Sequence, residues 1–328
     1  MHTLTATQTD REHILQVTRG WLPRVSRSFA PSIALLGEEM EAAVGVAYLL
    51  CRILDTIEDS SLSADEKRAL LHQFLSSIDN EPELSDFLKN AQEFGVFEDD
   101  DDGQLLLASN NVLQALSGLK EGPRSIILAC VYEMGEGMAE LAGLQTIENE
   151  KELTHYCHIV AGTVGGFLTS LYLMTHTSTA EHKQTLQEEA EAFAQGLQRV
   201  NIAKDASKDN KRKVQFIPGL SIDKPGSIER HTRFCIGTLS YLDSALRYTL
   251  AIDPKSPYRC FCALPLMLAV HTLNRIGGHP EVFSVSNPPR IPREDTLKLI
   301  EFCRLHAGND EALIEQYQTA SADLRARQ

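Results

Sequence analysis

Several features are scarce in this 328-residue sequence, and each scarcity excludes a class of protein. Aromatic residues make up only 6% of the chain, and segments that alternate Val, Ile or Thr with polar residues are nearly absent. Half-buried β-strands require such alternation, whereas helix-forming residues dominate here, so the sequence predicts an all-α protein. Basic residues are also few: 31 Lys and Arg stand against 45 Asp and Glu, a net charge of −14. This balance argues against nucleic acid as a partner, because nucleic acids select basic surfaces.

Signals for secretion, disulfide pairing and membrane anchoring are lacking as well. The N-terminal stretch MHTLTATQTDREH has no apolar core, and the C-terminal stretch EQYQTASADLRARQ is polar and carries no anchor. The seven cysteines are odd in number and lie in or beside apolar runs, as reduced core thiols of cytosolic proteins do. Cys260 and Cys262 form C-x-C without a second pair, so zinc is not expected. We expect a cytoplasmic protein, soluble or peripheral to a membrane.

The chain shows no shift in composition and no long linker, although its length would permit two domains. We therefore predict a single all-α domain over residues 1–328, with a helical tail at 294–328. Ser63 and Glu66 form an S-x-x-E capping box, which predicts the start of a helix. Residues 95–103, GVFEDDDDG, predict a solvated acidic linker. Further helices are predicted at residues 10–23, 105–116, 124–141 and about 180–209.

Three apolar runs predict core helices: Ala42–Leu54, Ile159–Met174 and Phe261–Leu273. The first is apolar on every side except at Arg52, as a buried helix is. The second carries no charge, but it is short for a membrane span. Its three glycines suit close approach by a ligand or a neighbouring helix. In the third run, Pro265 is expected near the first turn.

The first apolar run ends in an acidic stripe. On a helix, Arg52, Asp55 and Asp59 lie at i, i+3 and i+7, with Tyr48 one turn earlier on the same face and Glu58 alongside. Two carboxylates about 6 Å apart repel by about 3 kcal/mol at an effective dielectric near 20, and by far less in open water. A single D-x-x-x-D pair is more typical of a solvated helix end, but a second stripe elsewhere in the chain changes that balance.

Asn201, Asp205 and Asp209 form the second acidic stripe, at i, i+4 and i+8 of one helix, with Gln198 just before them. If the stripes face each other, four carboxylates line one cavity and require cations. Hard oxygen ligands, few per metal, fit Mg²⁺, which takes its remaining ligands from waters and substrate phosphates. The apolar surroundings imply that the rest of the ligand is apolar. The residues thus predict metal-assisted loss of diphosphate to give an allylic cation in a dry pocket.

Segments between about Arg24 and Leu273 match the blocks of a known family in their order: SRSFA, YLLCRILDTIED, MGEGMAE, YCHIVAGTVG, LQRVNIAKDASKD and FCALP. In these segments the chain resembles the squalene/phytoene synthase family, and YCHIVAG and FCALP are similar to its squalene synthase branch. The resemblance implies a single all-α isoprenoid-synthase-type fold around a central cavity. It also implies Mg²⁺-dependent head-to-head joining of two farnesyl diphosphates through presqualene diphosphate, followed by reduction with NADPH to squalene.

The resemblance also implies roles by position. Tyr156 would manage protons or cation charge in the first half-reaction, and an aromatic face beside a carbocation is stabilising. His155 and His158, which flank it, are expected to be structural rather than zinc ligands. The implied metal ligands, whose four aspartates are also implied to be catalytic, are Asp55, Glu58, Asp59, Asn201, Asp205 and Asp209. The implied contacts with the substrates are Ser26, Arg27, Ser28, Tyr48, Arg52, Gln198 and Asn201.

Some positions depart from the family pattern. Lys204 and Lys208 stand where the family usually has Arg and Glu, and lysine cannot fork onto two phosphate oxygens as arginine does. No G-x-G-x-x-G follows a strand, so the NADPH site is not expected to be of Rossmann type. Basic side chains must hold this cofactor instead, and those expected are Lys204, Arg212, Lys213, Arg290 and Arg293. The last two resemble a basic pair that contacts cofactor phosphate in squalene synthases, at a different spacing.

Alternatives to a reductive enzyme remain open on the sequence alone. A non-reducing head-to-head synthase would give dehydrosqualene or phytoene, or would stop at presqualene diphosphate. A non-catalytic scaffold of the same fold would be free to lose the four aspartates and Tyr156, which this chain keeps. A helical binding module without chemistry leaves the paired stripes unexplained. An oily product must still reach a bilayer, which implies peripheral membrane contact for its release.

Overall fold

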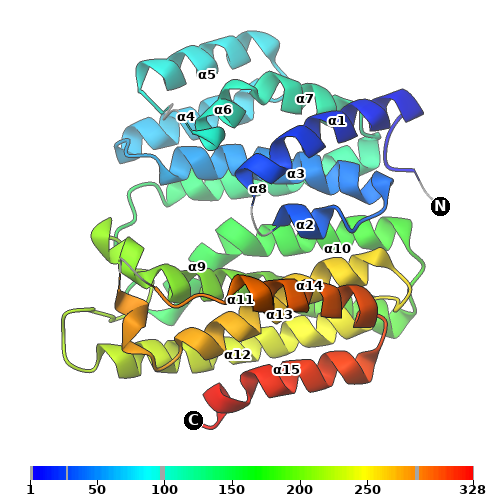
Figure 1. The fold of residues 1–328 in the computed structure, drawn as a ribbon. Helices are drawn as coiled ribbons and strands as arrows, with labels where there is room; N and C mark the ends of the chain where they lie inside the picture. The colour runs from blue at the N-terminus through cyan, green and yellow to red at the C-terminus, as the bar shows by residue number, and fades with distance from the viewer. Residues whose placement is uncertain (1–2, 27–28, 97–99, 285–287, 328) are drawn as a thin grey trace. The chain divides into compact units, whose positions relative to one another are not determined.

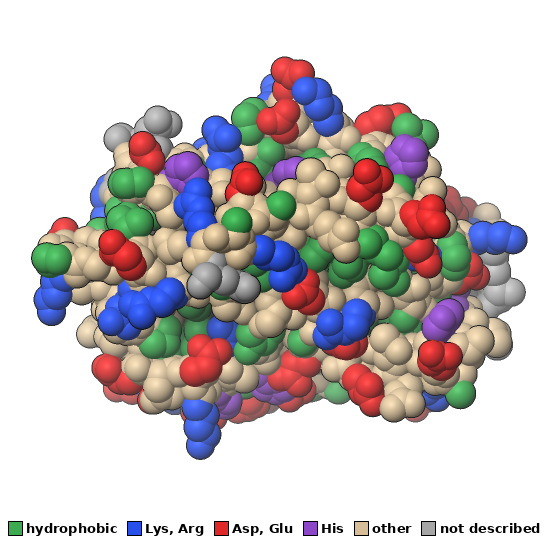
Figure 2. Space-filling model, turned by 90° about the horizontal axis from the view of Figure 1, so that it is seen from below, with side chains coloured by type: hydrophobic (Ala, Val, Ile, Leu, Met, Phe, Trp, Pro, Cys, Tyr) green, Lys and Arg blue, Asp and Glu red, His purple; other side chains and the backbone are tan. Residues whose placement is uncertain are grey.

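The computed structural model describes residues 3–26, 29–96, 100–284 and 288–327 (Figure 1). Within these ranges it contains fifteen α-helices, one short π-helix and one short 3₁₀ helix, and its only extended pairings are two isolated bridges. The prediction of an all-α fold is confirmed. On the face seen in Figure 2, Lys and Arg side chains are interspersed with Asp and Glu rather than gathered into one patch.

The chain divides into two compact units, each with its own contacts. Unit 1 comprises Met1–Gly143 and Ser170–Thr177, and unit 2 comprises Leu144–Thr169 and Ser178–Gln328. The prediction that the whole chain is a single domain stays a prediction.

The helices of unit 1 are α1 (Gln8–Val25), α2 (Phe29–Ile33), α3 (Glu38–Asp59), α4 (Ala64–Ser77), α5 (Glu81–Glu93), α6 (Asp101–Leu107), α7 (Ser109–Ser117) and α8 (Glu121–Glu140). Helix α3 is central to the unit and packs against α1, α6, α7 and α8. Its apolar residues from Ala42 to Leu54 are buried, as predicted. Helices α1 and α3 approach so closely that a Cβ on Gly45 would lie 2.9 Å from the Thr18 side chain.

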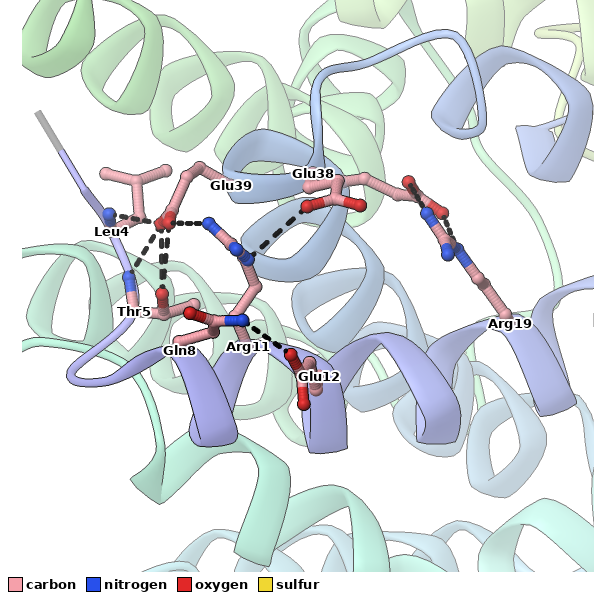
Figure 3. Close-up of polar contacts among 9 residues, drawn as sticks. Leu4, Thr5, Gln8, Arg11, Glu12, Arg19, Glu38 and Glu39 are labelled. Atoms are coloured by element: carbon pink, nitrogen blue, oxygen red, sulfur yellow. Dashed lines mark hydrogen bonds and ion pairs between the residues drawn. The ribbon is translucent and has the colours of Figure 1, made fainter. Parts of the chain in front are cut away.

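Polar contacts fix the N-terminal end of α3 (Figure 3). The Glu39 carboxylate accepts the backbone N–H of Leu4 at 2.6 Å and a hydrogen bond from Arg11 at 3.0 Å. Arg19 of α1 donates two hydrogen bonds of 2.6 Å to Glu41. Carboxylates are favourable at this end of a helix, where the backbone N–H groups carry partial positive charge. The buried helix is therefore anchored at the end away from the first acidic stripe.

Other predictions for unit 1 are confirmed only in part. The stretch 95–103 joins α5 to α6 and has exposed residues, but Asp100 caps α6 and the next two aspartates belong to α6 and form ion pairs with α1 and α3. Residues 97–99 of that stretch lie outside the described residues. The helix predicted at 105–116 is interrupted at Ala108, between α6 and α7. The capping box is confirmed, since Ser63 accepts the N–H of Glu66 and donates its own N–H to the Glu66 carboxylate.

The helices of unit 2 are α9 (Glu150–Cys157), the π-helix η1 (His158–Gly162), the first part of α10 (Thr163–Thr175), α11 (Ala180–Lys211), α12 (Ser227–Ala251), α13 (Pro257–Ile276), the 3₁₀ helix η2 (Pro280–Phe283), α14 (Arg293–His306) and α15 (Asp310–Arg325). The long helices α11 and α12 pack side by side, and α13 packs against both as well as α14 and α15. The predicted place of Pro265 is wrong, because α13 already begins at Pro257 and Pro265 lies in its interior.

The segment Glu150–Thr175 is the one helix of the described residues that is long and apolar enough to cross a membrane. Its most apolar window has a mean hydropathy of 1.4, and 44% of that window is buried. The core helix of a soluble protein passes the same test, so this is weak evidence for membrane association.

Candidate active site

The first acidic stripe lies at the C-terminal end of α3 and comprises Asp55, Glu58 and Asp59, preceded by Arg52. The helix macrodipole is negative at this end, so each carboxylate there is unfavourable by about 0.3–1 kcal/mol. No basic residue lies in the last turn of α3, which is fully described. Carboxylates that cost stability in this way are typical of a cation site rather than of a structural helix end.

Asp55 shows the electrostatic cost most clearly. Burial raises the pKa of Asp55 to about 7, against the attraction of Arg52, and repulsion from Asp59, Glu58 and Asp102 adds to the rise. The Asp55 side chain keeps 37% of its exposure, so water still reaches the carboxylate. A cation bound here would replace that water and relieve the repulsion.

Arg52 is held by a residue that the sequence did not single out. Its Nε donates to Oδ1 of Asp102 at 2.9 Å, and its Nη2 donates to Oδ2 of Asp102 at 2.5 Å. Its Nη1 lies 4.0 Å from Oδ2 of Asp55. Burial lowers the pKa of Arg52, but the hydrogen bonds and the charge of Asp102 raise it by more. The guanidinium predicted to contact diphosphate therefore uses one edge for Asp102 and keeps its Nη1 edge beside Asp55.

Ser26 and Tyr48 complete the described part of this site. The buried hydroxyl of Ser26 accepts the N–H groups of Phe29 at 3.0 Å and Ala30 at 3.2 Å, which fixes the start of α2. Burial raises the pKa of Tyr48, and a hydrogen bond with Ser26 and the charge of Arg52 oppose the rise. Arg27 and Ser28, which were also predicted to contact substrate, lie outside the described residues.

The second acidic stripe lies on α11 in unit 2. Lys204 and Lys208, the two lysines that differ from the family pattern, both contact it. Lys208 Nζ lies 2.8 Å from Oδ1 of Asp205, and Lys204 Nζ lies 3.4 Å from Oδ2 of the same carboxylate. Lys204 also donates to Oδ1 of Asn201 at 3.2 Å. Asp209 lies one turn further on and is half-buried. A metal ion that binds Asp205 therefore has to compete with two ammonium groups.

The segment that follows α11 is tied to the helix that carries Tyr156. Gln215 donates its N–H to Gln145 at 2.7 Å and accepts the N–H of Ile147 at 2.9 Å. The ring of Phe216 stacks on that of Tyr156, with centroids 4.6 Å apart and planes 23° apart. The buried Tyr156 ring is thus held from one side by the segment after the second acidic stripe.

Tyr156 is also fixed through its own helix. Arg199 of α11 is buried and donates hydrogen bonds to Glu150 and Thr154 of α9. Its guanidinium lies 4.2 Å from the centre of the Tyr241 ring. The π-helix η1 begins at His158, two residues after Tyr156, and such helices are frequent at functional sites. No feature of the sequence predicts this π-helix.

The histidines beside Tyr156 and the two cysteines of the C-x-C pair lie in surroundings that disfavour zinc. His155 is exposed, and His158 lies 3.0 Å from the Glu191 carboxylate. Burial raises the pKa of the Cys260 and Cys262 thiols, which disfavours the thiolate that zinc requires. Among the described residues no group of three or more His, Cys, Asp or Glu could hold a metal ion by itself. Each acidic stripe nevertheless supplies the one or two carboxylates that suffice for Mg²⁺ when phosphate oxygens and waters supply the rest.

The predicted cofactor-binding residues lie in two places within unit 2. Arg212 caps the C-terminus of α11, and Lys213 follows with a φ of 60° in the left-handed region. Arg290 lines a cavity of about 960 Å³ between α13, α14, α15 and the segment before α14. The side-chain oxygen Oδ1 of Asn274, a residue that lines this cavity, is buried without a hydrogen-bond partner among the described residues. Arg293 is the first residue of α14.

The all-α architecture is that of the isoprenoid-synthase class of enzymes. The model of the family described as squalene/phytoene synthase matches residues 22–295, and the chain belongs to this family. It is 30% identical to the squalene synthase of Schizosaccharomyces pombe over 326 residues, covering 92% of this chain and 67% of the relative. It is 29% identical to the human squalene synthase over 283 residues, covering 80% of this chain and 64% of the relative.

Solved structures agree with this assignment. A complex of TcSQS with the ligand BPH1237 matches with a TM-score of 0.82 and 25% identity, covering 96% of this chain and 92% of that one. A dehydrosqualene synthase in complex with a ligand matches with a TM-score of 0.59 and 16% identity, covering 91% of this chain and 96% of that one. At that identity the second match shows the fold alone.

Proposed function

We propose that this protein is a squalene synthase, which joins two farnesyl diphosphates head to head through presqualene diphosphate and reduces that intermediate with NADPH. The observation that carries the proposal is the match to squalene synthases over 92% of the chain. The chain keeps both acidic stripes and Tyr156.

Mg²⁺ is the proposed metal, since hard carboxylate ligands at few positions suit it. Asp55, Glu58 and Asp59 would hold it at the first stripe, and Asn201, Asp205 and Asp209 at the second. When bound, the metal would neutralise the leaving diphosphate. The Nη1 edge of Arg52 lies beside Asp55 and is proposed to bind a phosphate oxygen there. Tyr48 and Ser26 would orient the same diphosphate through their hydroxyl groups, together with Arg27 and Ser28.

The two lysines of the second stripe are proposed to change partners when substrate binds. Lys204 and Lys208 contact the two carboxylate oxygens of Asp205. A metal ion at Asp205 would release the two ammonium groups, which could then bind phosphate oxygens as point charges. Gln198, one turn before Asn201 on the same helix, would contact the substrate.

Tyr156 is proposed to act in the first half-reaction. Its ring is buried and held by Phe216, so its face and hydroxyl have a fixed position. The face of an aromatic ring attracts a nearby carbocation, and the phenol can pass a proton to or from the departing diphosphate.

NADPH is the proposed reductant, bound by basic side chains rather than by a glycine-rich turn. The cavity of about 960 Å³ has a size sufficient for part of a dinucleotide, and Arg275, Arg290, Lys298 and Arg327 are among its lining residues. The orphaned oxygen of Asn274 could accept a hydrogen bond from the nucleotide. Lys204, Arg212, Lys213 and Arg293 would supply further charge to its phosphates.

Purified protein incubated with farnesyl diphosphate and Mg²⁺ tests this proposal. We expect presqualene diphosphate without NADPH, squalene with NADPH, and no turnover in EDTA. Dehydrosqualene as the only product with ample NADPH would contradict the reductive assignment, and turnover without a divalent cation would contradict the metal assignment. Because squalene is insoluble in water, we also propose that the protein is cytoplasmic and makes peripheral contact with a membrane, which cosedimentation with vesicles would measure.

A further inference from the structure

Arg52 faces two carboxylates that it contacts very differently. Asp102 takes the Nε and Nη2 edge of the guanidinium through two hydrogen bonds of 2.9 Å and 2.5 Å. Asp55 lies on the other side, where its Oδ2 is 4.0 Å from Nη1, beyond hydrogen-bond distance. Arginine has five N–H donors in one rigid plane, so the fork with Asp102 leaves three of them available on the side of Asp55.

The distance between Arg52 and Asp55 matters because the two side chains have different proposed tasks. Asp55 and Arg52 are three residues apart on α3, a spacing at which unlike charges readily form a direct ion pair. Such a pair would occupy the carboxylate with a guanidinium and the guanidinium with a carboxylate. Neither group would then be ready for its own ligand. In the structure Asp102, brought from α6, holds the far edge of the guanidinium, and the contact with Asp55 is a long one of 4.0 Å.

Asp102 is well placed to hold Arg52. It is the second residue of α6, so its carboxylate lies in the first turn, where the partial positive charge of the helix favours it. Both side chains of the pair are only 29% exposed, which limits screening by solvent. Two parallel hydrogen bonds also fix the plane of the guanidinium as well as its position.

We propose that Asp102 is a positioning residue for the reaction: it holds Arg52 away from Asp55, so that the guanidinium is reserved for the substrate diphosphate and the carboxylate for the metal ion. This inference rests on the proposed function.

The neighbouring Asp101 provides a matched control on the same helix. Its Oδ1 accepts hydrogen bonds from Arg24 of α1 at 2.8 Å, so it also ties α6 to the rest of unit 1. Arg24 lies over the Trp21 ring, 4.4 Å from its centre, and belongs to neither acidic stripe. Removing the contact between Arg24 and Asp101 tests whether loosening α6 is by itself sufficient to weaken ligand binding, because the change leaves Arg52 and Asp102 in place.

The experiment measures binding of pyrophosphate by calorimetry in excess Mg²⁺, and binding of Mg²⁺ at saturating pyrophosphate, with no turnover involved. We expect Asp102→Asn to weaken both by about tenfold, the scale of one charge-assisted hydrogen bond no longer held in place. Asp101→Asn should bind as the wild type does, and Asp102→Glu should restore part of the affinity. In an Arg52→Gln background, Asp102→Asn should have no further effect, because Asp102 acts through Arg52.

Unchanged or tighter binding by Asp102→Asn would overturn the inference. If Asp102 merely competed with phosphate for Arg52, removing its charge would tighten binding. If Asp101→Asn loses as much affinity as Asp102→Asn, Asp102 serves only to dock α6. The same conclusion follows if Asp102→Asn weakens binding as much in the Arg52→Gln background as in the wild type. If Asp102→Asn does not fold, Asp102→Glu is compared with the wild type instead. Weaker binding by Asp102→Glu is then the expected result, and unchanged or tighter binding would overturn the inference. Failure of the wild type to bind magnesium pyrophosphate would instead refute the proposed function itself.

Discussion

Replacing Asp55 by Asn should stabilise the metal-free protein while it removes activity. Asn has the same shape but no charge, so the change removes the cost of burying a carboxylate and the repulsion from Asp59, which together outweigh the lost attraction of Arg52. It leaves the packing of α3 in place. Most substitutions in a working site lose stability and activity together. A gain in stability together with a loss of activity is expected only where a carboxylate binds a ligand and its charge lowers the stability of the fold.

The size of the gain follows from the pKa of Asp55. A value of about 7 instead of the usual 3.8 corresponds to about 4 kcal/mol for a fully buried group at 1.36 kcal/mol per pKa unit. The side chain is 37% exposed, so solvent screening reduces this, and we expect a gain of about 1–2 kcal/mol at pH 8. For a chain of this length, that gain corresponds to a rise in melting temperature of roughly 1–3 °C.

The gain should depend on pH in a definite direction. Because the pKa of Asp55 is higher in the folded than in the unfolded state, the folded protein binds more protons between pH 3.8 and about pH 7. The wild type therefore loses stability as the pH rises through this window and loses no more above it. The difference between wild type and Asp55→Asn should be largest above pH 7 and should vanish below about pH 4.

Thermal unfolding in EDTA, at several pH values, measures this prediction beside an assay of diphosphate release. Asp86→Asn, at an exposed carboxylate of α5, is the control for loss of a negative charge alone. The reasoning is refuted if Asp55→Asn melts below the wild type at pH 8, or if it retains near-full activity.

Three further predictions concern unit 2. Tyr156→Phe should slow the formation of presqualene diphosphate more than its conversion to squalene, and supplying the intermediate directly separates the two steps; equal loss in both would count against the assigned role. Lys208→Glu should lower the Mg²⁺ concentration for half-maximal activity by roughly 3- to 10-fold, because it frees an oxygen of Asp205 and adds a carboxylate; an unchanged Mg²⁺ dependence would show that the lysine does not compete with metal. Replacing Arg212 and Lys213 together by Ala should raise the KM for NADPH several-fold with little change in consumption of farnesyl diphosphate, if each supplies a charge-assisted hydrogen bond of about 1.5–3 kcal/mol; an unchanged KM would remove these residues from the cofactor site.

Periodicity and local signals predicted the helices well where burial decides them. The run from Ala42 to Leu54 is apolar on all sides, so only a buried helix fits it, and the acidic stripe follows from the register of that helix. The capping box at Ser63 was predictable because its hydrogen bonds join residues three positions apart.

Contacts between distant segments could not be predicted in the same way. The pairing of Arg52 with Asp102 joins residues 50 positions apart, and a run of aspartates has the same composition whether it is solvated or paired. The stacking of Phe216 on Tyr156 likewise depends on how the segment after α11 folds back. The ion pair between Asp205 and Lys208 could have been predicted from the sequence, since the two residues are three positions apart on a helix.

The most direct test of the proposed reaction uses NADPH with deuterium at both C4 positions, together with farnesyl diphosphate and Mg²⁺. A nicotinamide cofactor delivers its C4 hydrogen as hydride, so a reductive synthase transfers one deuterium to each product molecule. We predict squalene that is one deuterium heavier than the product made with ordinary NADPH, and no labelled product from Asp55→Asn. An unlabelled C30 hydrocarbon from the wild type would contradict the assignment of this chain as a squalene synthase that carries out its own reduction.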